Sequence, residues 1–319
     1  MPRIRACKGI SLYGQEYLLV LPERYLPSID QGQTGGEFGH EIKATERVML
    51  RCGANWRPTT VKRVIDTYPT STRVAKVATD EGTAFLKGMG NPAGNESLAT
   101  ELVCGELAAW FGLRTPDFAI LGVADIEIPL DGRGFVEFGP AFVSRELPGA
   151  TGDGGNVFLS KISRPRDVAK LVVFDTWIRN RDRYPPPDDL EEPPENRDNL
   201  FFTPNGRKFD LVALDHSHCF VETTLEDELG GSHLLEDDRI YGAFPEFVPY
   251  LSHEAVALAA RRLAEIDLGM VTEVVGSVPR EWGVSAGLRD TWARLIFERA
   301  KRVSSYVLPR LTRQLNMEF

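Results

Sequence analysis

This sequence has no long apolar run. No stretch reaches the roughly 18 residues that are needed to cross a bilayer, and the first 22 residues lack the compact apolar core and the small-residue cleavage site of a signal peptide. Internal repeats and long low-complexity tracts are also missing. These absences predict a cytoplasmic protein that makes no contact with a membrane.

Cysteine and basic residues are scarce. The four cysteines, Cys7, Cys52, Cys104 and Cys219, are widely scattered with no CxxC pair, which is typical of a reduced protein. Asp and Glu number 46 against 37 Lys and Arg, so the net charge is −9. An acidic chain disfavours broad nonspecific binding to nucleic acid or anionic membranes. We therefore expect no direct nucleic-acid partner.

A phosphate-binding glycine motif of the Walker type is absent. The Gly-rich segment at residues 30–41, DQGQTGGEFGHE, lacks the Gly-Lys-Ser/Thr ending and has no clear strand-to-helix context. It is typical of an exposed loop. Residues 1–66 otherwise hold only short apolar runs, and we predict that they form an N-terminal extension whose packing the sequence leaves open.

Regular patterns begin at about residue 72. Residues 72–79 and 83–89 are β-prone runs separated by Asp-Glu-Gly, which is a good hairpin turn. This segment predicts the first two strands of a sheet.

One helix and two further strands follow the hairpin. Residues 95–112 predict a helix with Asn95 as its N-cap and Gly112 as its end. Residues 117–124 and 139–147 have strand patterns. The first half of the chain thus predicts a small sheet with one helix packed on it.

The second half is mainly helical. Residues 166–180 have a strongly helical pattern, residues 199–203 and 208–215 predict a hairpin, and residues 252–319 are helical. A strand-rich lobe followed by a helix-rich lobe predicts an α+β fold with a cleft between the lobes.

A lysine and a glutamate in the first lobe suit phosphoryl transfer. That reaction requires a cation on the phosphates, oxygen ligands for magnesium, and a carboxylate that orients the nucleophile. Lys87 stands late in a strand, before a helix that carries glutamates, as a kinase lysine does. Lys76 is the competitor, but its strand precedes the turn and lies farther from that helix.

Two glutamates on the helix are candidates to pair with Lys87. At 100° per residue, Glu96 shares a face with the apolar residues Ala99, Val103 and Leu107, whereas Glu101 lies on a weaker face. We therefore favour Glu96. Its alternative role is to stabilise the helix N-terminus through the macrodipole.

The tripeptide Asn-Arg-Asp occurs twice, ending at Asp182 and again at Asp198. Asp182 follows a helix whose apolar stripe should be packed, whereas Asp198 follows a polar, Pro-rich spacer that should not be held rigidly. A catalytic carboxylate needs a fixed position, so Asp182 is the predicted base.

Three further polar residues lie at element ends or on a packed face. Asn199 directly precedes a strand and Asp215 ends one, and the oxygens of both suit magnesium. Asp175 lies on the apolar stripe of its helix, where a buried carboxylate needs partners. We predict that Asp175 is a structural brace that accepts hydrogen bonds from backbone N–H groups of the catalytic loop.

Taken together, these motifs resemble the HipA-like kinases. The resemblance is carried by FDTWIRNRDR, NLFF and LVALDHSHCF, with support from STRVAKVATDEGTAFLKG and GNESLATELVCGELAAWFGLRTPD. It implies a two-lobed protein kinase-like fold, with an N-lobe at residues 67–145 and a C-lobe at residues 146–319. It also implies ATP and Mg²⁺ as cofactors, a protein Ser/Thr substrate, and a separate antitoxin-like partner.

The resemblance further implies a role for each candidate residue. Lys87 would contact phosphates with Glu96 as its brace, Asp182 would be the base, and Asn199 and Asp215 would hold magnesium. A phosphate-covering loop would comprise Thr70, Ser71 and Thr72, and adenine would meet the backbone at Val143, Ser144, Arg145 and Glu146.

The catalytic loop departs from the kinase pattern. Sixteen residues separate Asp182 from Asn199, where a protein kinase has four. An inserted segment is therefore predicted near residues 184–198. The departure keeps open an alternative function, a catalytically weak pseudokinase or a nucleotide-binding regulatory module. A zinc hydrolase that uses the DHSHC segment at residues 215–219 is a weaker alternative, because no second ligand cluster is evident.

Overall fold

The computed structural model describes residues 4–10, 16–22, 50–152, 157–186 and 196–316. The chain divides into two units, Met1–Arg47 and Val48–Phe319. In the first unit, β1 (Ile4–Ile10) and β2 (Glu16–Pro22) form an antiparallel hairpin. The Gly-rich segment at residues 30–41 lies outside the described residues.

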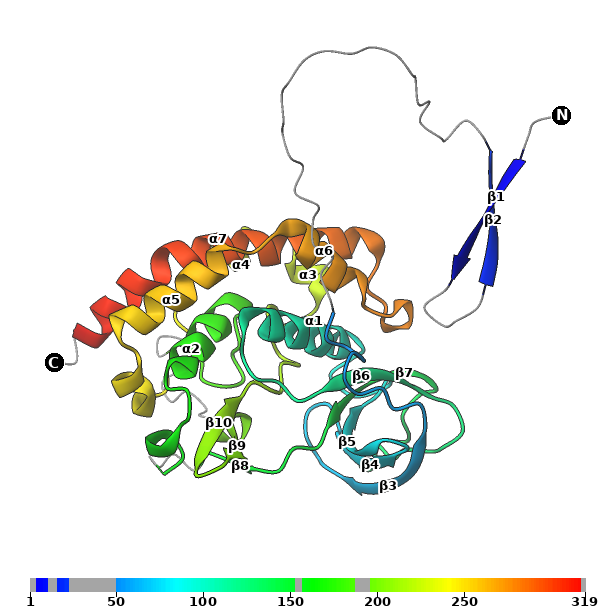
Figure 1. Ribbon diagram of the computed structural model, residues 1–319, viewed down its shortest axis with the longest axis horizontal. Helices are drawn as coiled ribbons and strands as arrows, with labels where there is room; N and C mark the ends of the chain where they lie inside the picture. The colour runs from blue at the N-terminus through cyan, green and yellow to red at the C-terminus, as the bar shows by residue number, and fades with distance from the viewer. Residues whose placement is uncertain (1–3, 11–15, 23–49, 153–156, 187–195, 317–319) are drawn as a thin grey trace, which may run out of the picture. The chain divides into compact units, whose positions relative to one another are not determined.

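A five-stranded antiparallel sheet opens the second unit (Figure 1). Its strand order is β3-β4-β5-β7-β6. The bounds are β3 (Val61–Thr67), β4 (Ala75–Thr79), β5 (Gly82–Lys87), β6 (Phe118–Val123) and β7 (Gly139–Arg145). The predicted hairpin is confirmed, since Thr79 pairs with Gly82 across the turn. Each of the four strand patterns read in the first half of the sequence is a strand of this sheet.

The sheet-bearing lobe begins earlier than residue 67, where the sequence placed its start. The backbone N–H groups of Arg51 and Cys52 donate to Glu106 at 2.8 and 2.7 Å. Trp56 is buried and donates to the carbonyl of Glu81 at 3.0 Å. The edge strand β3 was missed because most of its side chains are exposed, so it lacks the apolar alternation of a half-buried strand.

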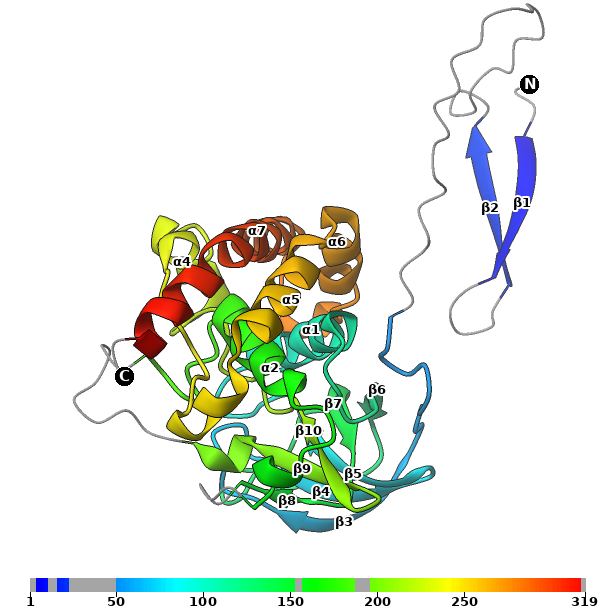
Figure 2. The ribbon, with the colours of Figure 1, turned by 60° about the vertical axis from the view of Figure 1, so that its left-hand side comes forward.

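Helix α1 (Glu96–Phe111) lies between this sheet and the helices of the other lobe (Figures 1 and 2). Its predicted limits are confirmed: Asn95 precedes it, and Gly112 ends it in the left-handed conformation at φ 82°. The Asn95 side chain does not cap the helix; its oxygen accepts from the N–H of Gly90 at 3.2 Å. Nearly every α1 side chain is buried, because both flanks of the helix are covered.

A small second sheet has the order β10-β9-β8. It consists of β8 (Ala150–Thr151), β9 (Phe201–Asn205) and β10 (Lys208–Val212), and the predicted hairpin of its last two strands is confirmed. Strand β8 begins five residues after the end of β7 and pairs with β9. A side chain at Gly149 would overlap the Phe202 carbonyl, so the two segments approach closely.

The C-terminal lobe is mainly helical. Its α-helices are α2 (Arg166–Ile178), α3 (Leu225–Glu228), α4 (Ser232–Glu236), α5 (His253–Ala264), α6 (Leu268–Gly276) and α7 (Ala286–Asn316). Short 3-10 turns cover Leu159–Lys161, Arg197–Asn199, Pro245–Tyr250 and Arg280–Trp282. Within the described residues, no helix has both the length and the apolar character to cross a membrane.

Two apolar cores support this arrangement. The larger joins α1 to α2 and the helices that follow, with Leu171, Phe174 and Ile178 fully buried as the stripe predicted. The smaller lies on the other face of the five-stranded sheet. A strand-rich lobe and a helical lobe, joined through α1, confirm the predicted α+β two-lobed fold. Residues 187–195 of the predicted insert lie outside the described residues.

Candidate active site

Lys87 is the centre of a buried charged cluster. It ends β5, and its Nζ lies 2.8 Å from each of Glu101 Oε2, Asp215 Oδ1 and Ser217 Oγ. Burial alone would lower the pKa of Lys87, but the carboxylates of Asp215 and Glu101 outweigh it and hold that pKa above its ordinary value. The ammonium group is therefore charged and fixed between the two lobes.

The expected pairing of Lys87 with Glu96 is wrong. Glu101 is the partner, and Glu96 instead accepts from the backbone N–H of Leu225 at 2.7 Å, at the start of α3. The helical-face argument failed because α1 is buried on both flanks and has no single inward face. Glu101 stands five residues further along α1, about 7.5 Å at 1.5 Å per residue.

Glu101 also binds the chain that follows Asp215. Its Oε2 accepts from the backbone N–H of His216 at 3.0 Å and from Ser217 Oγ at 2.8 Å. These contacts join α1 to the segment that carries Asp215. One signal pointed to Glu101, because a charge in the middle of an apolar helix needs a partner. Nothing in the sequence singled out Ser217.

Asp215 stands in the loop after β10 rather than at its end. The strand stops at Val212, and Asp215 has a positive φ of 57°. Burial opposes ionisation, but Lys87 outweighs it and lowers the pKa of Asp215 to about 2. Beside it, burial, aided by Arg183, lowers the pKa of His216 to about 3, so this imidazole is neutral.

The structure brings Asp182 and Asn199 together. Asn199 Nδ2 donates to Asp182 Oδ2 at 2.9 Å, although sixteen residues separate them. Arg183 is fully buried and donates to the carbonyls of Asn199 and Leu214. Arg183 thereby fixes the predicted base, the predicted metal ligand and the residue before Asp215 in one region.

Asp175 is a buried brace for this loop, but its partners differ from those expected. Its carboxylate pairs with Arg183 Nε at 2.9 Å and accepts from Asn180 Nδ2 at 3.0 Å. Side chains thus take the place of the predicted backbone N–H donors. Burial raises the pKa of Asp175 to about 6, since Arg183 and Asn180 only partly offset the loss of water.

The expectation that Asp198 is loosely held is also wrong. Asp198 lies in the 3-10 turn Arg197–Asn199, whose neighbours are anchored by two contacts. The N–H of Asn196 donates to the Arg183 carbonyl at 3.1 Å, and Arg197 pairs with Glu246 at 2.9 Å. How firmly the backbone is held therefore does not distinguish Asp182 from Asp198. What their carboxylates face does distinguish them, because Asp182 contacts Asn199 and Asp198 lines a cavity.

The predicted phosphate-covering loop is the turn between β3 and β4. Ser71 Oγ lies 2.7 Å from Nε2 of His218, which follows Asp215 by three residues. Thr70 Oγ1 accepts from the N–H of Val74 at 3.2 Å, and Thr72 is buried. The turn is thus held closed on itself and tied to the segment after Asp215.

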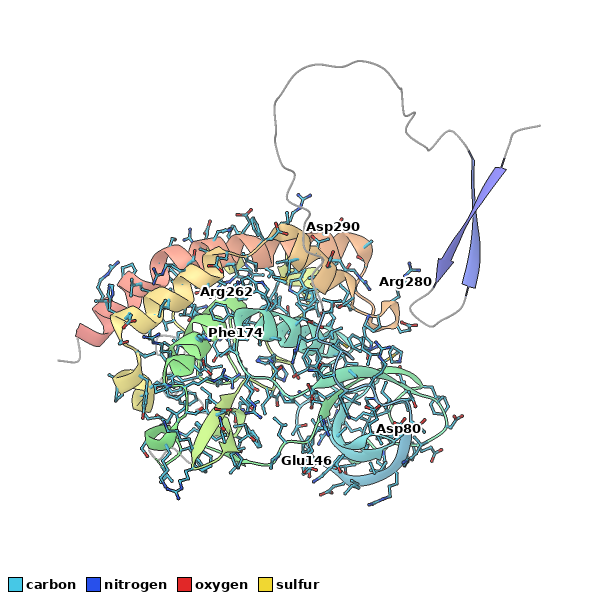
Figure 3. The ribbon with its side chains drawn as sticks, in the orientation of Figure 1. Asp80, Glu146, Phe174, Arg262, Arg280 and Asp290 are labelled. Atoms are coloured by element: carbon cyan, nitrogen blue, oxygen red, sulfur yellow. The ribbon has the colours of Figure 1, made fainter. Side chains whose placement is uncertain are left out.

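A cavity of about 380 Å³ adjoins the charged cluster. Lys87, Glu101, Asp215 and His216 line one part of it, while Ser144, Arg145 and Glu146 line another. Its apolar walls are Val74, Phe85, Phe118, Phe142, Leu147, Phe201, Ala213 and Leu214. Figure 3 shows Glu146 between the two sheets.

Not every candidate reaches this cavity. Val143 is not part of the lining, because its side chain is fully buried in the core on the other face of the sheet; the adenine contact predicted for its backbone stays a prediction. Asp198 lines the cavity, whereas Asp182 and Asn199 do not. Lys76, the competitor of Lys87, pairs with Glu146 at 2.7 Å.

The DHSHC segment does not form a zinc site. His216 is buried edge-on against Phe174, whereas His218 contacts Ser71. Among the residues that the structure describes, no three His, Cys, Asp or Glu side chains gather as metal ligands. The oxygens of Asn199 and Asp215 remain the candidates for magnesium.

The sequence model of the HipA-like kinase family matches residues 71–306. This chain belongs to the HipA-like kinases. No curated protein matches it. Among solved structures it is similar to the Helicobacter pylori proinflammatory kinase CtkA, with 11% identity and a TM-score of 0.52, over 80% of this chain and 96% of that one. A Ralstonia eutropha protein provisionally assigned as an aminoglycoside phosphotransferase has 14% identity and a TM-score of 0.23, over 80% and 95%.

The likeness to CtkA confirms the kinase-like fold of this HipA-like kinase. For a member of a kinase family, this cavity is the candidate nucleotide site, since the polar groups in and beside the cavity fit a nucleotide with magnesium. A fixed ammonium group suits phosphates, hard oxygens suit the metal, and a partly apolar slot suits a base.

Proposed function

We propose that this HipA-like kinase transfers the γ-phosphate of ATP, with magnesium, to a Ser or Thr hydroxyl of a protein. The observation that carries the proposal is the cluster of Lys87, Glu101 and Asp215 at the cavity, each contact 2.8 Å long. Phosphoryl transfer depends mainly on positioning and electrostatic stabilisation. A cation fixed between two lobes supplies both.

Each residue of the proposed nucleotide site has a separate role. Lys87 contacts phosphate oxygens, and Glu101 holds its ammonium group in place. Asn199 and Asp215 would hold the magnesium ion, whose charge stabilises the transferring phosphoryl group. The backbone from Ser144 to Glu146 faces the adenine, and the turn with Thr70, Ser71 and Thr72 covers the phosphates.

Asp182 is the proposed base. Its carboxylate orients the substrate hydroxyl and accepts its proton, and Asn199 fixes the carboxylate through the 2.9 Å hydrogen bond. Arg183, paired with the buried Asp175, holds this loop at the end of α2. The protein substrate, a separate antitoxin-like partner and a cytoplasmic location are parts of the proposal that rest on the family resemblance.

Nucleotide binding gives the first test. ATP with magnesium should raise the melting temperature, because a ligand that binds only the folded state stabilises it. Asp215→Ala should remove most of the magnesium-dependent part of this shift. If millimolar ATP with magnesium leaves the melting temperature of the wild type unchanged, the proposal fails. Labelled ATP then identifies whatever protein accepts phosphate.

A second candidate function is a nucleotide-binding module with weak catalysis or none. It is favoured by one observation: Asp182 bonds to Asn199 and does not line the cavity. Binding of ATP without turnover, in the presence of the labelled acceptor candidates, would favour the module over the kinase.

A further inference from the structure

Ser217 is an uncharged member of the buried cluster around Lys87. Lys87 Nζ donates to Ser217 Oγ at 2.8 Å, and the Ser217 hydroxyl donates to Glu101 Oε2 at 2.8 Å. Asp215 Oδ1 lies 3.3 Å from the same hydroxyl, and the Ser217 side chain is buried. Lys87, Glu101 and Asp215 each have a role in the proposed function, whereas this hydroxyl has none so far.

The partners of Lys87 must change when a nucleotide with magnesium binds. An ammonium group has three hydrogens, and Glu101, Asp215 and Ser217 each accept one of them. The side chain of Asp215 is 34% exposed, against 9% for Lys87 and 6% for Glu101. Asp215 is thus the partner that a cation can reach, and its carboxylate oxygens suit magnesium. With Asp215 engaged there, the acceptors left to Lys87 are Glu101, Ser217 and a phosphate oxygen.

Asp215 and Ser217 both attach Lys87 to the loop that follows β10. They stand two residues apart in that loop, and each accepts from the same Nζ. While both contacts exist, either one keeps the lysine on the loop. We propose that Ser217 is a positioning residue that keeps Lys87 attached to this loop when Asp215 binds magnesium. The inference rests on the proposed function, since it concerns a residue of that same site.

The test measures how much magnesium tightens the binding of ATP, by calorimetry on the full chain with magnesium and with a chelator. Magnesium should tighten ATP binding in the wild type. In Ser217→Ala this gain should be about threefold to tenfold smaller, the scale of one protein hydrogen bond. The gain is the informative quantity, because a general loosening of the site changes ATP binding with and without magnesium alike.

Ser97→Ala is the matched control. Ser97 is also buried, but its hydroxyl contacts Gly94 and Asn91. This variant should keep the wild-type gain, and so should Ser217→Thr, which retains a hydroxyl. An unchanged gain in Ser217→Ala, or an equal loss in Ser217→Thr, would overturn the inference while leaving the kinase proposal intact. If magnesium does not tighten ATP binding in the wild type, the proposed function itself fails.

A second measurement needs no nucleotide. Urea titrations of the ligand-free chain compare Ser217→Ala, Asp215→Ala and the double variant. Each single substitution leaves the other contact to Lys87 in place. The double variant should therefore lose more unfolding free energy than the two single losses together. Additive losses would overturn the inference whatever the calorimetry shows, because the two contacts would then not substitute for each other.

Discussion

The two aspartates of the repeated tripeptide differ in what each carboxylate faces. Asp182 meets Asn199, and Asp198 meets the cavity. Asp182→Asn should lower turnover by about 100-fold or more, the usual scale for losing an acid or base group, while ATP binding largely survives. Asp198→Asn should leave turnover at saturating ATP nearly unchanged. Steady-state rates of both variants measure this. An inactive Asp198→Asn variant beside an active Asp182→Asn variant would show that Asp198 is the base and Asp182 is not.

The two glutamates of α1 should also behave differently on substitution. Glu101→Gln removes a charge 2.8 Å from Lys87 in a buried site and should lower kcat/KM about tenfold to 100-fold. Glu96→Gln keeps an oxygen that accepts from Leu225, so its effect should stay below about threefold. Kinetics with ATP as the varied substrate measure both. Equal losses would mean that the Lys87 contact has no special importance.

Asp175 should make stability depend on pH. Its folded pKa of about 6 exceeds the ordinary value of 3.8. The contribution of Asp175 to the free energy of unfolding is therefore full below pH 3.8 and is lost as the pH rises through 6. Between pH 4.5 and 7, wild type should lose about 2 kcal/mol of unfolding free energy relative to Asp175→Asn. Urea titrations at both pH values give this difference. A difference that is constant or grows with pH would contradict the raised pKa.

At the scale of elements, the sequence predicts where a helix begins and ends better than it predicts which side chains of the helix face a given partner. Gly112 ends α1 where expected, because a left-handed residue after a helix favours glycine. The periodicity of α1 could not select Glu101, because a helix covered on both flanks carries apolar residues all round. Contacts such as Arg183 with the Asn199 carbonyl depend on how distant segments pack, and no local pattern encodes them.

The connection between α2 and the loop that follows it depends on a glycine in another segment, Gly242. Gly242 has φ 72°, and a Cβ there would overlap the Asp175 carboxylate. Gly242→Ala should therefore destabilise the fold by about 2 kcal/mol or more, through backbone strain and displacement of Asp175. Gly276→Ala is the control, since a Cβ at Gly276 in α6 meets nothing. Chemical denaturation compares the two, and equal stabilities would show that Asp175 moves freely.

At the scale of the molecule, the start of the sheet-bearing lobe can be tested by truncation. A chain that begins at Val48 retains Trp56 and β3 and should melt close to the full chain. A chain that begins at Thr67 loses both. Removing the buried Trp56 alone should cost about 3 kcal/mol or more. Thermal melts followed by circular dichroism measure this. A stable, cooperative fold in the shorter chain would restore the boundary read from the sequence.

The contact between Ser71 and His218 determines how strongly the turn between β3 and β4 is held in its closed form. It is an exposed side-chain hydrogen bond of 2.7 Å, and such a bond contributes about 0.5 to 1.5 kcal/mol. That free energy changes the ratio of closed to open turn by only about twofold to 13-fold. The contact therefore biases the turn toward its closed form without locking it.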